Sequence, residues 1–581
     1  MAVALTMAQM KLAVMRHSYR GQRAQMAGTG AAIGVLLAGG TAYLGYLNPD
    51  WLAAALAVWL LGWMLGPVFM GGGDETLRPE YFSILGLSPR RLATGLLTAS
   101  FVGVAPLVTF GALAGLIVAG TRVGALNALV AVPAMLLQLS VFVLLSKIAV
   151  AVVGIALRSR VGAIAAGVIN GVILSSLGQI WVFMVAFGVS GTPAAVWWMP
   201  SAWGLRAVRG EWIFLAALAA LVLVLLALWA LLLGRRAGRP RVSGRGRRPI
   251  TAGTAAGAVV AKEFRTWSRD LVRSHQLAFA LAYGVWFAAS PLIVGWNGML
   301  PYAGPIFVVM AAGMASNLYG TDGTALWLTM MTPGATDVRG RQLAWITTQG
   351  VIAIIITVTC TAITGGPWPL ILALLPALLG GAAGLVPLVS VYALVPGTDP
   401  HRRSGNPLRT SEDEGGLTGL AYLMLALVLA TGAPAGLAAY WFGWAGVAVG
   451  LLTGGLCYWL FGLLAERRLL SHGPELLDTM RTGKKAASST SIMRFEELSK
   501  VRKNIAGLGF GFGAIPLFPQ GIVALLFVAN GKTDNSWFLA TYLPAPWNYA
   551  VAMGFILLGL ALYGSALWVV RKRPEADRIS A

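Results

Sequence analysis

The sequence predicts an all-α polytopic membrane protein, and two observations carry this prediction. Hydrophobic residues make up 57% of the 581 residues and charged residues only 11%, which lies outside the usage of soluble domains. In addition, about fourteen apolar stretches are each long enough to cross a hydrocarbon core about 30 Å thick. The 73 glycines fit helices that pack closely in lipid.

The apolar stretches fall into two sets of six and a final pair. They cover residues 26–47, 51–71, 94–119, 124–155, 162–189 and 212–234, then 277–295, 302–318, 343–364, 368–396, 417–438 and 440–464, then 505–529 and 545–570. We therefore expect two six-helix repeats plus two C-terminal helices. The expected regions are a first half (1–234), a basic linker (235–257), a second half (258–480) and a C-terminal region with a linker and two further spans (481–581).

The basic residues indicate how the chain is oriented. If the N-terminus is cytoplasmic, only Arg122, Arg206, Arg209 and Lys532 of the 43 Lys and Arg residues lie on the far side, which is a strong positive-inside bias. Both termini are then cytoplasmic. Basic residues are spread over many span edges, so we do not expect a nucleic-acid partner. High Ala, Gly and Arg usage favours a GC-rich bacterium and hence the bacterial plasma membrane.

The expected spans contain no Asp, Glu or His in their interiors. Carriers coupled to protons or sodium normally keep such groups at mid-membrane, so we expect an external energy source. Lys147 is the one charge well inside a span, and it either faces the translocation path or extends its stem toward the membrane surface. Cys360 and Cys457 lie in apolar spans, which leaves neither a disulfide framework nor a metal site.

Each half begins with an amphipathic basic segment before its first span. In the second half, Phe264 and Trp267 lie on the apolar face and Lys262 lies largely opposite. Lys11 and Arg16 flank the corresponding apolar stripe in the first half. This pattern predicts helices that lie in the membrane interface.

A short loop helix is predicted between the second and third spans of each half. Its apolar side chains need a cover, and a partner protein is the natural one. The candidate docking residues are Asp74, Glu75, Arg78, Glu80, Phe82 and Leu85 in the first loop and Asp322, Trp327 and Leu328 in the second.

These loops resemble those of the membrane subunits of bacterial ABC-type exporters, in the form that fuses two six-span halves. The resemblance covers about residues 1–480 and rests on the segments Asp74–Leu92, Tyr319–Trp327, Arg158–Arg160 and Trp198–Trp203. It implies that the interface helices and loop helices dock on a separate ATPase and transmit its motion. It does not explain the last two spans.

The chain lacks a nucleotide-binding loop of its own. The nearest match, Gly531-Lys532-Thr533, has Leu526 where the motif needs its first glycine. We therefore expect no catalytic residues and no cofactor in this chain, with ATP and magnesium bound by two copies of a partner ATPase.

The outer segment with Trp198, Pro200 and Trp203 is either an interfacial aromatic belt or an outer gate. The substrate expected from the resemblance is a hydrophobic or amphipathic small molecule, peptide or lipid that crosses the bilayer outward. Two alternatives remain open. One is an ion-coupled secondary multidrug carrier, which lacks the intramembrane acids it would need. The other is a membrane-embedded lipid-processing enzyme, for which the outer acids are few.

Overall fold

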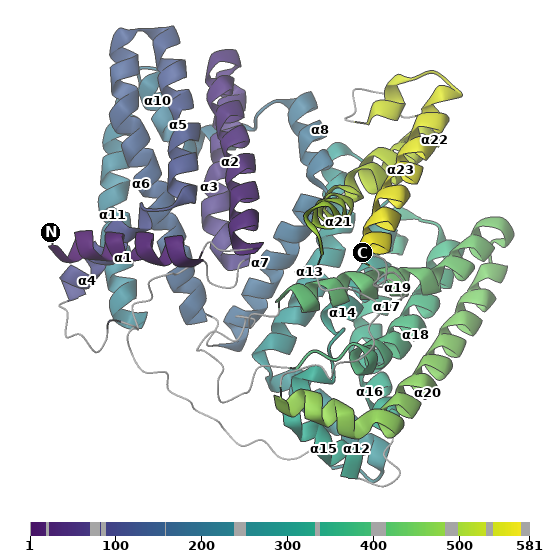
Figure 1. Cartoon of the computed structure of the whole chain (residues 1–581). Coiled ribbons are helices and arrows are strands. Elements are labelled where there is room, and N and C mark those ends of the chain that lie inside the picture. The colour runs from purple at the N-terminus through teal and green to yellow at the C-terminus, as the bar shows by residue number, and fades with distance from the viewer. Residues whose placement is uncertain are drawn as a thin grey trace, which may run out of the picture. The chain divides into compact units, whose positions relative to one another are not determined.

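The computed structural model describes residues 2–18, 22–69, 82, 89–156, 159–236, 251–331, 337–396, 414–482, 498–529, 531 and 538–570. Every regular element within these ranges is a helix (Figure 1). Among the described residues, thirteen helices are long and apolar enough to cross a membrane, and Leu300–Met314 is a shorter apolar helix. The chain is an all-α polytopic membrane protein with about fourteen spans, as the sequence predicted.

The chain forms two compact units, which we call the main unit and the C-terminal unit. The main unit comprises Met1–Ile180 and Ser190–Lys484, and therefore holds the second half and most of the first. The C-terminal unit comprises Lys485–Ala581 together with the short stretch Trp181–Val189 from the first half.

The first half packs its spans around α3, α5, α6 and the short helix α10. Buried Leu52, Leu113, Leu116 and Leu205 lie at the centre of this cluster. Figure 1 shows the first helix lying crosswise to the spans at one end of this half. The helices are α1 (Ala2–Ser18), α2 (Gln22–Leu47), α3 (Pro49–Phe69), α4 (Pro89–Ser100), α5 (Val104–Val123), α6 (Ala125–Ala156), α7 (Arg160–Gly178), α8 (Ile180–Ser190), α9 (Ala194–Trp198), α10 (Pro200–Val208) and α11 (Ile213–Arg236).

The second half has the same order of a leading helix followed by spans. Its elements are α12 (Ala255–Arg269), α13 (Leu271–Ala289), η2 (Ser290–Val294), η3 (Leu300–Tyr302), α14 (Ala303–Met314), η4 (Gly320–Ala325), α15 (Leu326–Met331), α16 (Asp337–Trp345), η5 (Ile346–Gly350), α17 (Val351–Thr364), α18 (Trp368–Tyr392), α19 (Glu414–Phe442) and α20 (Ala445–Thr482). The leading helix packs on the start of the third span in both halves, as α1 on α4 and as α12 on α16.

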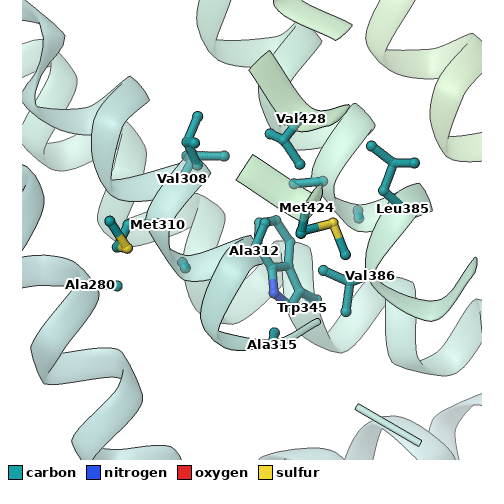
Figure 2. Close-up of a cluster of buried hydrophobic side chains, with 14 of the residues drawn as sticks. Ala280, Val308, Met310, Ala312, Ala315, Trp345, Leu385, Val386, Met424 and Val428 are labelled. Carbon is teal, nitrogen blue, oxygen red and sulfur yellow. The ribbon is translucent and has the colours of Figure 1, made fainter. Parts of the chain in front are cut away.

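The core of the second half surrounds the indole of Trp345. Figure 2 shows this side chain among Ala312 of α14, Ala315 just after α14, Val386 of α18 and Met424 of α19. All five residues are buried. The spans that contain α14, α18 and α19 therefore all pack against the third span at the end of α16, where η5 begins.

Several expected continuous spans are interrupted. The third span of the first half breaks at residues 101–103 between α4 and α5, and the fifth breaks at Gln179 between α7 and α8. In the second half, the third span passes from α16 to α17 through the π-helical turn η5. The last span, α20, runs well past its expected end and bends at His472, two residues before Pro474, because proline cannot continue a regular helix.

Glycines allow two pairs of helices in the main unit to meet backbone to backbone. A Cβ atom on Gly171 of α7 would overlap the carbonyl oxygen of Phe279 on α13. One on Gly380 of α18 would overlap the carbonyl oxygen of Gly454 on α20. Because helices in lipid gain little from burying apolar surface, such close contact is a main source of their association.

The C-terminal unit is built around the hairpin of its two spans. Its elements are α21 (Lys500–Phe512), η8 (Pro516–Val523), α22 (Ala524–Ala529), η9 (Leu539–Tyr542) and α23 (Trp547–Val570), with Trp181–Val189 of α8. The Trp181 ring meets Phe527 edge-on with centroids 5.6 Å apart and lies 5.8 Å from the Phe538 ring. The C-terminal part of the fifth span, Trp181–Val189, thus belongs with the last two spans.

Candidate functional site

Six charged side chains gather at one end of the second half, where α13 and α16 begin. We call them the six-charge cluster. Three are acidic and three are basic, so their formal charges balance. They come from the leading helix α12, the start of α13, the turn η4 and the start of α16, and they are Lys262, Glu263, Arg273, Asp322, Asp337 and Arg341.

Local sequence signals hold these elements in place. Thr254 caps α12 by accepting a hydrogen bond from the amide of Gly257 at 3.0 Å. Asp270 ends α12 and caps α13 by accepting from the amide of Val272 at 2.8 Å. Gly323 adopts φ 59°, a left-handed conformation that favours glycine, and this turns the chain from Asp322 into α15.

Arg341 is the centre of the cluster, and its side chain is completely buried. Its Nε donates to Asp337 Oδ2 at 2.7 Å, and its Nη2 pairs with Asp322 Oδ2. Its Nη1 lies 3.2 Å from Glu263 Oε1 as an ion pair, although the angle between them does not make a hydrogen bond. The guanidinium also lies 4.2 Å from the ring centroid of Tyr319. A single cation therefore joins η4, α12 and α16.

The other two cations close the cluster from its sides. Arg273 Nη1 donates to Glu263 Oε2 at 2.6 Å, and its Nη2 donates to Thr321 at 3.3 Å. Lys262 Nζ donates to Asp322 Oδ2 at 2.9 Å. Glu263 is 1% exposed whereas Lys262 is 46% exposed, so the Lys262 bond is the solvent-accessible edge of an otherwise buried network.

The charges of the cluster and its burial shift the pKa values of Tyr319 and Asp322. Burial and the neighbouring Asp337 carboxylate raise the pKa of Tyr319 well above its usual value, so its hydroxyl stays protonated and donates to Asp337 at 2.7 Å. Burial by itself would raise the pKa of Asp322, but Arg341 and Lys262 together outweigh burial and lower that pKa to about 2. Asp322 is therefore a permanent anion at physiological pH.

Next to the cluster, α15 presents an apolar outer face. Leu326 is 1% exposed and anchors the helix, whereas Trp327 is 49% and Met331 is 74% exposed. The neighbouring Leu328 is 54% exposed. The sequence predicted this exposure of Trp327 and Leu328. A six-residue helix would not hold such side chains in position without support from the chain behind it.

That support comes partly from the segment of α20 beyond its bend, which we call the α20 arm (residues 473–482). Leu476 and Met480 of the arm belong to the same buried cluster as Leu326, and Met330 packs against it. A Cβ on Gly473 would lie 2.5 Å from the Met330 methyl group. The sequence analysis ended the sixth span of this half at residue 464 and missed this contact.

In the first half, different contacts hold the leading helix α1 and Phe82 of the loop against the start of the third span. Lys11 of α1 donates to the carbonyl oxygen of Ala99 at 3.0 Å, near the C-terminal end of α4, where the helix dipole favours a cation. Phe82 is only 7% exposed and packs with Met7, Leu96 and Trp229. We expected Phe82 to be exposed and to need a partner, and this is corrected because α1, α4 and α11 already cover it.

The remaining predicted residues are distributed as follows. Asp74, Glu75, Arg78, Glu80 and Leu85 lie outside the described residues. Arg16 is exposed, Phe264 and Trp267 are half-buried on α12, and Lys147 is half-buried on α6. Asp322, predicted to dock a partner, forms ion pairs with Lys262 and Arg341 within the chain, and its docking role stays a prediction.

The outer segment of the first half is a pair of short helices, α9 and α10, pinned to α6. Gln138 Nε2 donates to the carbonyl oxygen of Pro200 at 2.7 Å, and its Oε1 accepts from the amide of Gly204 at 3.2 Å. Trp203 Nε1 donates to the carbonyl oxygen of Trp198 at 3.1 Å, and Trp198 remains 69% exposed.

The sequence analysis did not single out Glu263, Arg273, Asp337 or Arg341. It treated all acids as lying outside the membrane interior, and these acids do lie at span ends. Their burial was not visible, because their partners are distant in sequence. The i, i+4 spacing of Asp337 and Arg341 was the one local signal of an ion pair.

Comparison with known proteins adds nothing to this site: no family model, no curated protein and no solved structure matches the chain.

Replacing Arg341 by Leu should destabilise the protein far more than replacing Lys262 by Gln. Removing Arg341 leaves buried carboxylates uncompensated, which costs about 3–5 kcal/mol. The half-exposed Lys262 contributes less than about 1 kcal/mol. Thermal unfolding of both variants in the same detergent measures the difference. Equal melting temperatures would show that Arg341 does not hold the cluster together.

The contribution of Asp322 to stability should be constant near neutral pH and lost in acid. Its folded-state pKa of about 2 lies below the usual value of 3.8, so its charge stabilises the fold above about pH 4. This contribution is about 2 kcal/mol and falls as the pH drops toward 2. The stability difference between wild type and Asp322→Asn should therefore stay level from about pH 5 to 8 and shrink below about pH 4. A difference that changes around neutral pH would contradict the low pKa.

Proposed function

We propose that the chain is the membrane subunit of an ATP-driven exporter and that a separate ATPase energises it. It moves a hydrophobic or amphipathic compound out of the cell across a bacterial plasma membrane, with both of its own termini in the cytoplasm. The observation that carries this proposal is the exposed apolar face of α15, held in place by the six-charge cluster and the α20 arm.

The outer face of α15 has the composition of a docking surface. Trp327 and Met331 are exposed side by side with Leu328 on a helix that begins next to the cluster, outside the candidate spans. Tryptophan and methionine are enriched at the centres of protein interfaces. Exposure of this apolar surface to water is unfavourable. A cleft on a soluble partner would bury these side chains.

The six-charge cluster supplies a path by which motion of that partner would reach the membrane. Asp322 lies in the turn before α15, and Arg341 joins it to α16, which continues into the third span. Glu263 and Arg273 extend the same network to α12 and to the first span of the second half. A displacement of α15 would therefore move the leading helix and two spans together.

The charges of the cluster also favour an external energy source over ion coupling. Among the described residues, Glu263 and Asp337 are the fully buried carboxylates, and each pairs with Arg341. An ion-coupled carrier normally keeps ionisable groups in the membrane interior that bind the proton or the cation. A carboxylate already held by a buried arginine is a poor candidate for that role.

The complex isolated from its native membrane should contain one copy of this chain and two ATPase subunits, because each half contributes one docking loop. Native mass measurement of the purified complex tests this ratio. If no ATPase accompanies the chain, the proposal fails. Two copies of the chain in one complex would show that its halves do not supply both docking sites.

Replacing Trp327 by Asp should weaken ATPase binding while leaving the fold intact, since this side chain is half exposed. Loss of a large apolar anchor costs about 2 kcal/mol or more, which corresponds to roughly a thirtyfold weaker Kd. Thr324→Asp adds the same charge to the adjacent turn at an exposed position and serves as the control. The affinity of each variant for the purified ATPase is the measurement.

Normal ATPase affinity in a well-folded Trp327→Asp protein would reject α15 as the docking helix. An equal loss in Thr324→Asp would assign the effect to charge and not to the buried indole. Phe82 is not a suitable counterpart in the first half because its replacement would disrupt the buried contacts with α1 and α4.

A further inference from the structure

The buried face of the third span in the second half carries a row of polar atoms without hydrogen-bond partners in the protein. They are Gln342 Oε1, Trp345 Nε1, Gln349 Oε1 and Thr357 Oγ1. Their residues are at most 2% exposed. Buried polar groups in proteins are almost always paired, so each unpaired atom requires an explanation. The requirement is stronger in a membrane, where lipid offers no partner.

These four residues lie on one face of α16, η5 and α17. Their spacings of three, four and eight residues match the period of a helix, and the intervening Ala353 on the same face is fully buried as well. From Gln342 to Thr357 the row extends about 22 Å at about 1.5 Å per residue. It begins directly after Arg341 and therefore starts at the six-charge cluster.

Other bonds of these side chains leave the unpaired atoms available. The amide nitrogen of Gln342 donates to the carbonyl oxygen of Tyr458 at 2.8 Å, so only its oxygen lacks a partner. Trp345 offers an N–H donor, and Gln349 offers an acceptor one turn later. A single group that both accepts and donates would satisfy the two.

Glycines face both ends of the row. A Cβ on Gly462 of α20 would lie 2.7 Å from the amide atoms of Gln342, and one on Gly304 of α14 would overlap Thr357 Oγ1. The glycine backbones of the facing helices therefore pack directly against Gln342 and Thr357 and close the two ends of the row. The π-helical turn η5 lies between these two ends, and such turns widen a helix and interrupt its regular hydrogen bonds.

We propose that the middle of this row, at Trp345 and Gln349, is a binding site for internal water in the second half. Water supplies an acceptor for the Trp345 N–H and a donor for the Gln349 oxygen, which no apolar neighbour in this core can do. The site does not depend on the proposed transport function. It gives the π-helical turn hydrogen-bond partners that can be exchanged when the span bends.

Radiolytic hydroxyl-radical footprinting of the wild-type protein in lipid nanodiscs tests the site, because radicals formed from bound water oxidise adjacent side chains. Trp345 is 2% exposed, and Trp181 at 3% and Trp229 at 5% are matched controls with the same intrinsic reactivity. We expect Trp345 to be oxidised several-fold faster than both. Oxidation of Trp345 at the rate of the controls would overturn the proposal.

A Gln349→Leu variant provides a second test, because a bound water and a dry core predict opposite changes in the melting temperature. If Gln349 binds water, the substitution removes a hydrogen bond, lowers the melting temperature and slows the oxidation of Trp345. If its oxygen is instead unpaired in a dry core, the substitution removes an uncompensated polar group and leaves stability unchanged or higher, which contradicts the site. Should the variant fail to fold, the wild-type footprint still decides the question.

Discussion

The buried guanidinium of Arg341 is the interaction on which the second half depends. An isolated cation in such a place would be strongly unfavourable, because its hydration would be lost without replacement. Three carboxylates from η4, α12 and α16 surround it, and the Tyr319 ring covers one face. These elements can therefore assemble only together. The arrangement gives α15 a rigid base while leaving its outer face free of charge.

The two halves share an order of elements but not the chemistry that joins them. In the second half, α12 and α16 are joined by paired charges; in the first, α1 and α4 are joined by Lys11 on a helix end and by the buried ring of Phe82. A second difference lies at the opposite end of each half. There α9 and α10 separate the last spans of the first half, whereas Gly443 and Trp444 form a tight turn between α19 and α20. A molecule that contacts both halves therefore meets two different surfaces.

The sequence predicted the features that follow from local patterns. Apolar length located the spans, and helical periodicity located the amphipathic leading segments before α2 and α13. Exposure of Trp327 was predicted from its place on a short loop helix. The partners of Arg341 were not, because Glu263 and Asp322 are brought to it only by tertiary packing. The burial of Phe82 likewise depends on where α1 lies, and apolar composition alone cannot distinguish a covered side chain from a docking one.

The bend in α20 has a mechanical consequence. Before the bend, α20 meets α18 backbone to backbone at Gly380 and Gly454, where no side chain separates the two helices. After the bend, the α20 arm packs with Leu476 and Met480 against the buried Leu326 side of α15. The α20 arm is therefore a continuation of the helix that packs against α18. α20 is 38 residues long, which corresponds to about 57 Å if it were straight. Because α20 continues from its contact with α18 into the arm, a displacement of α15 would act on α18 and α20 together.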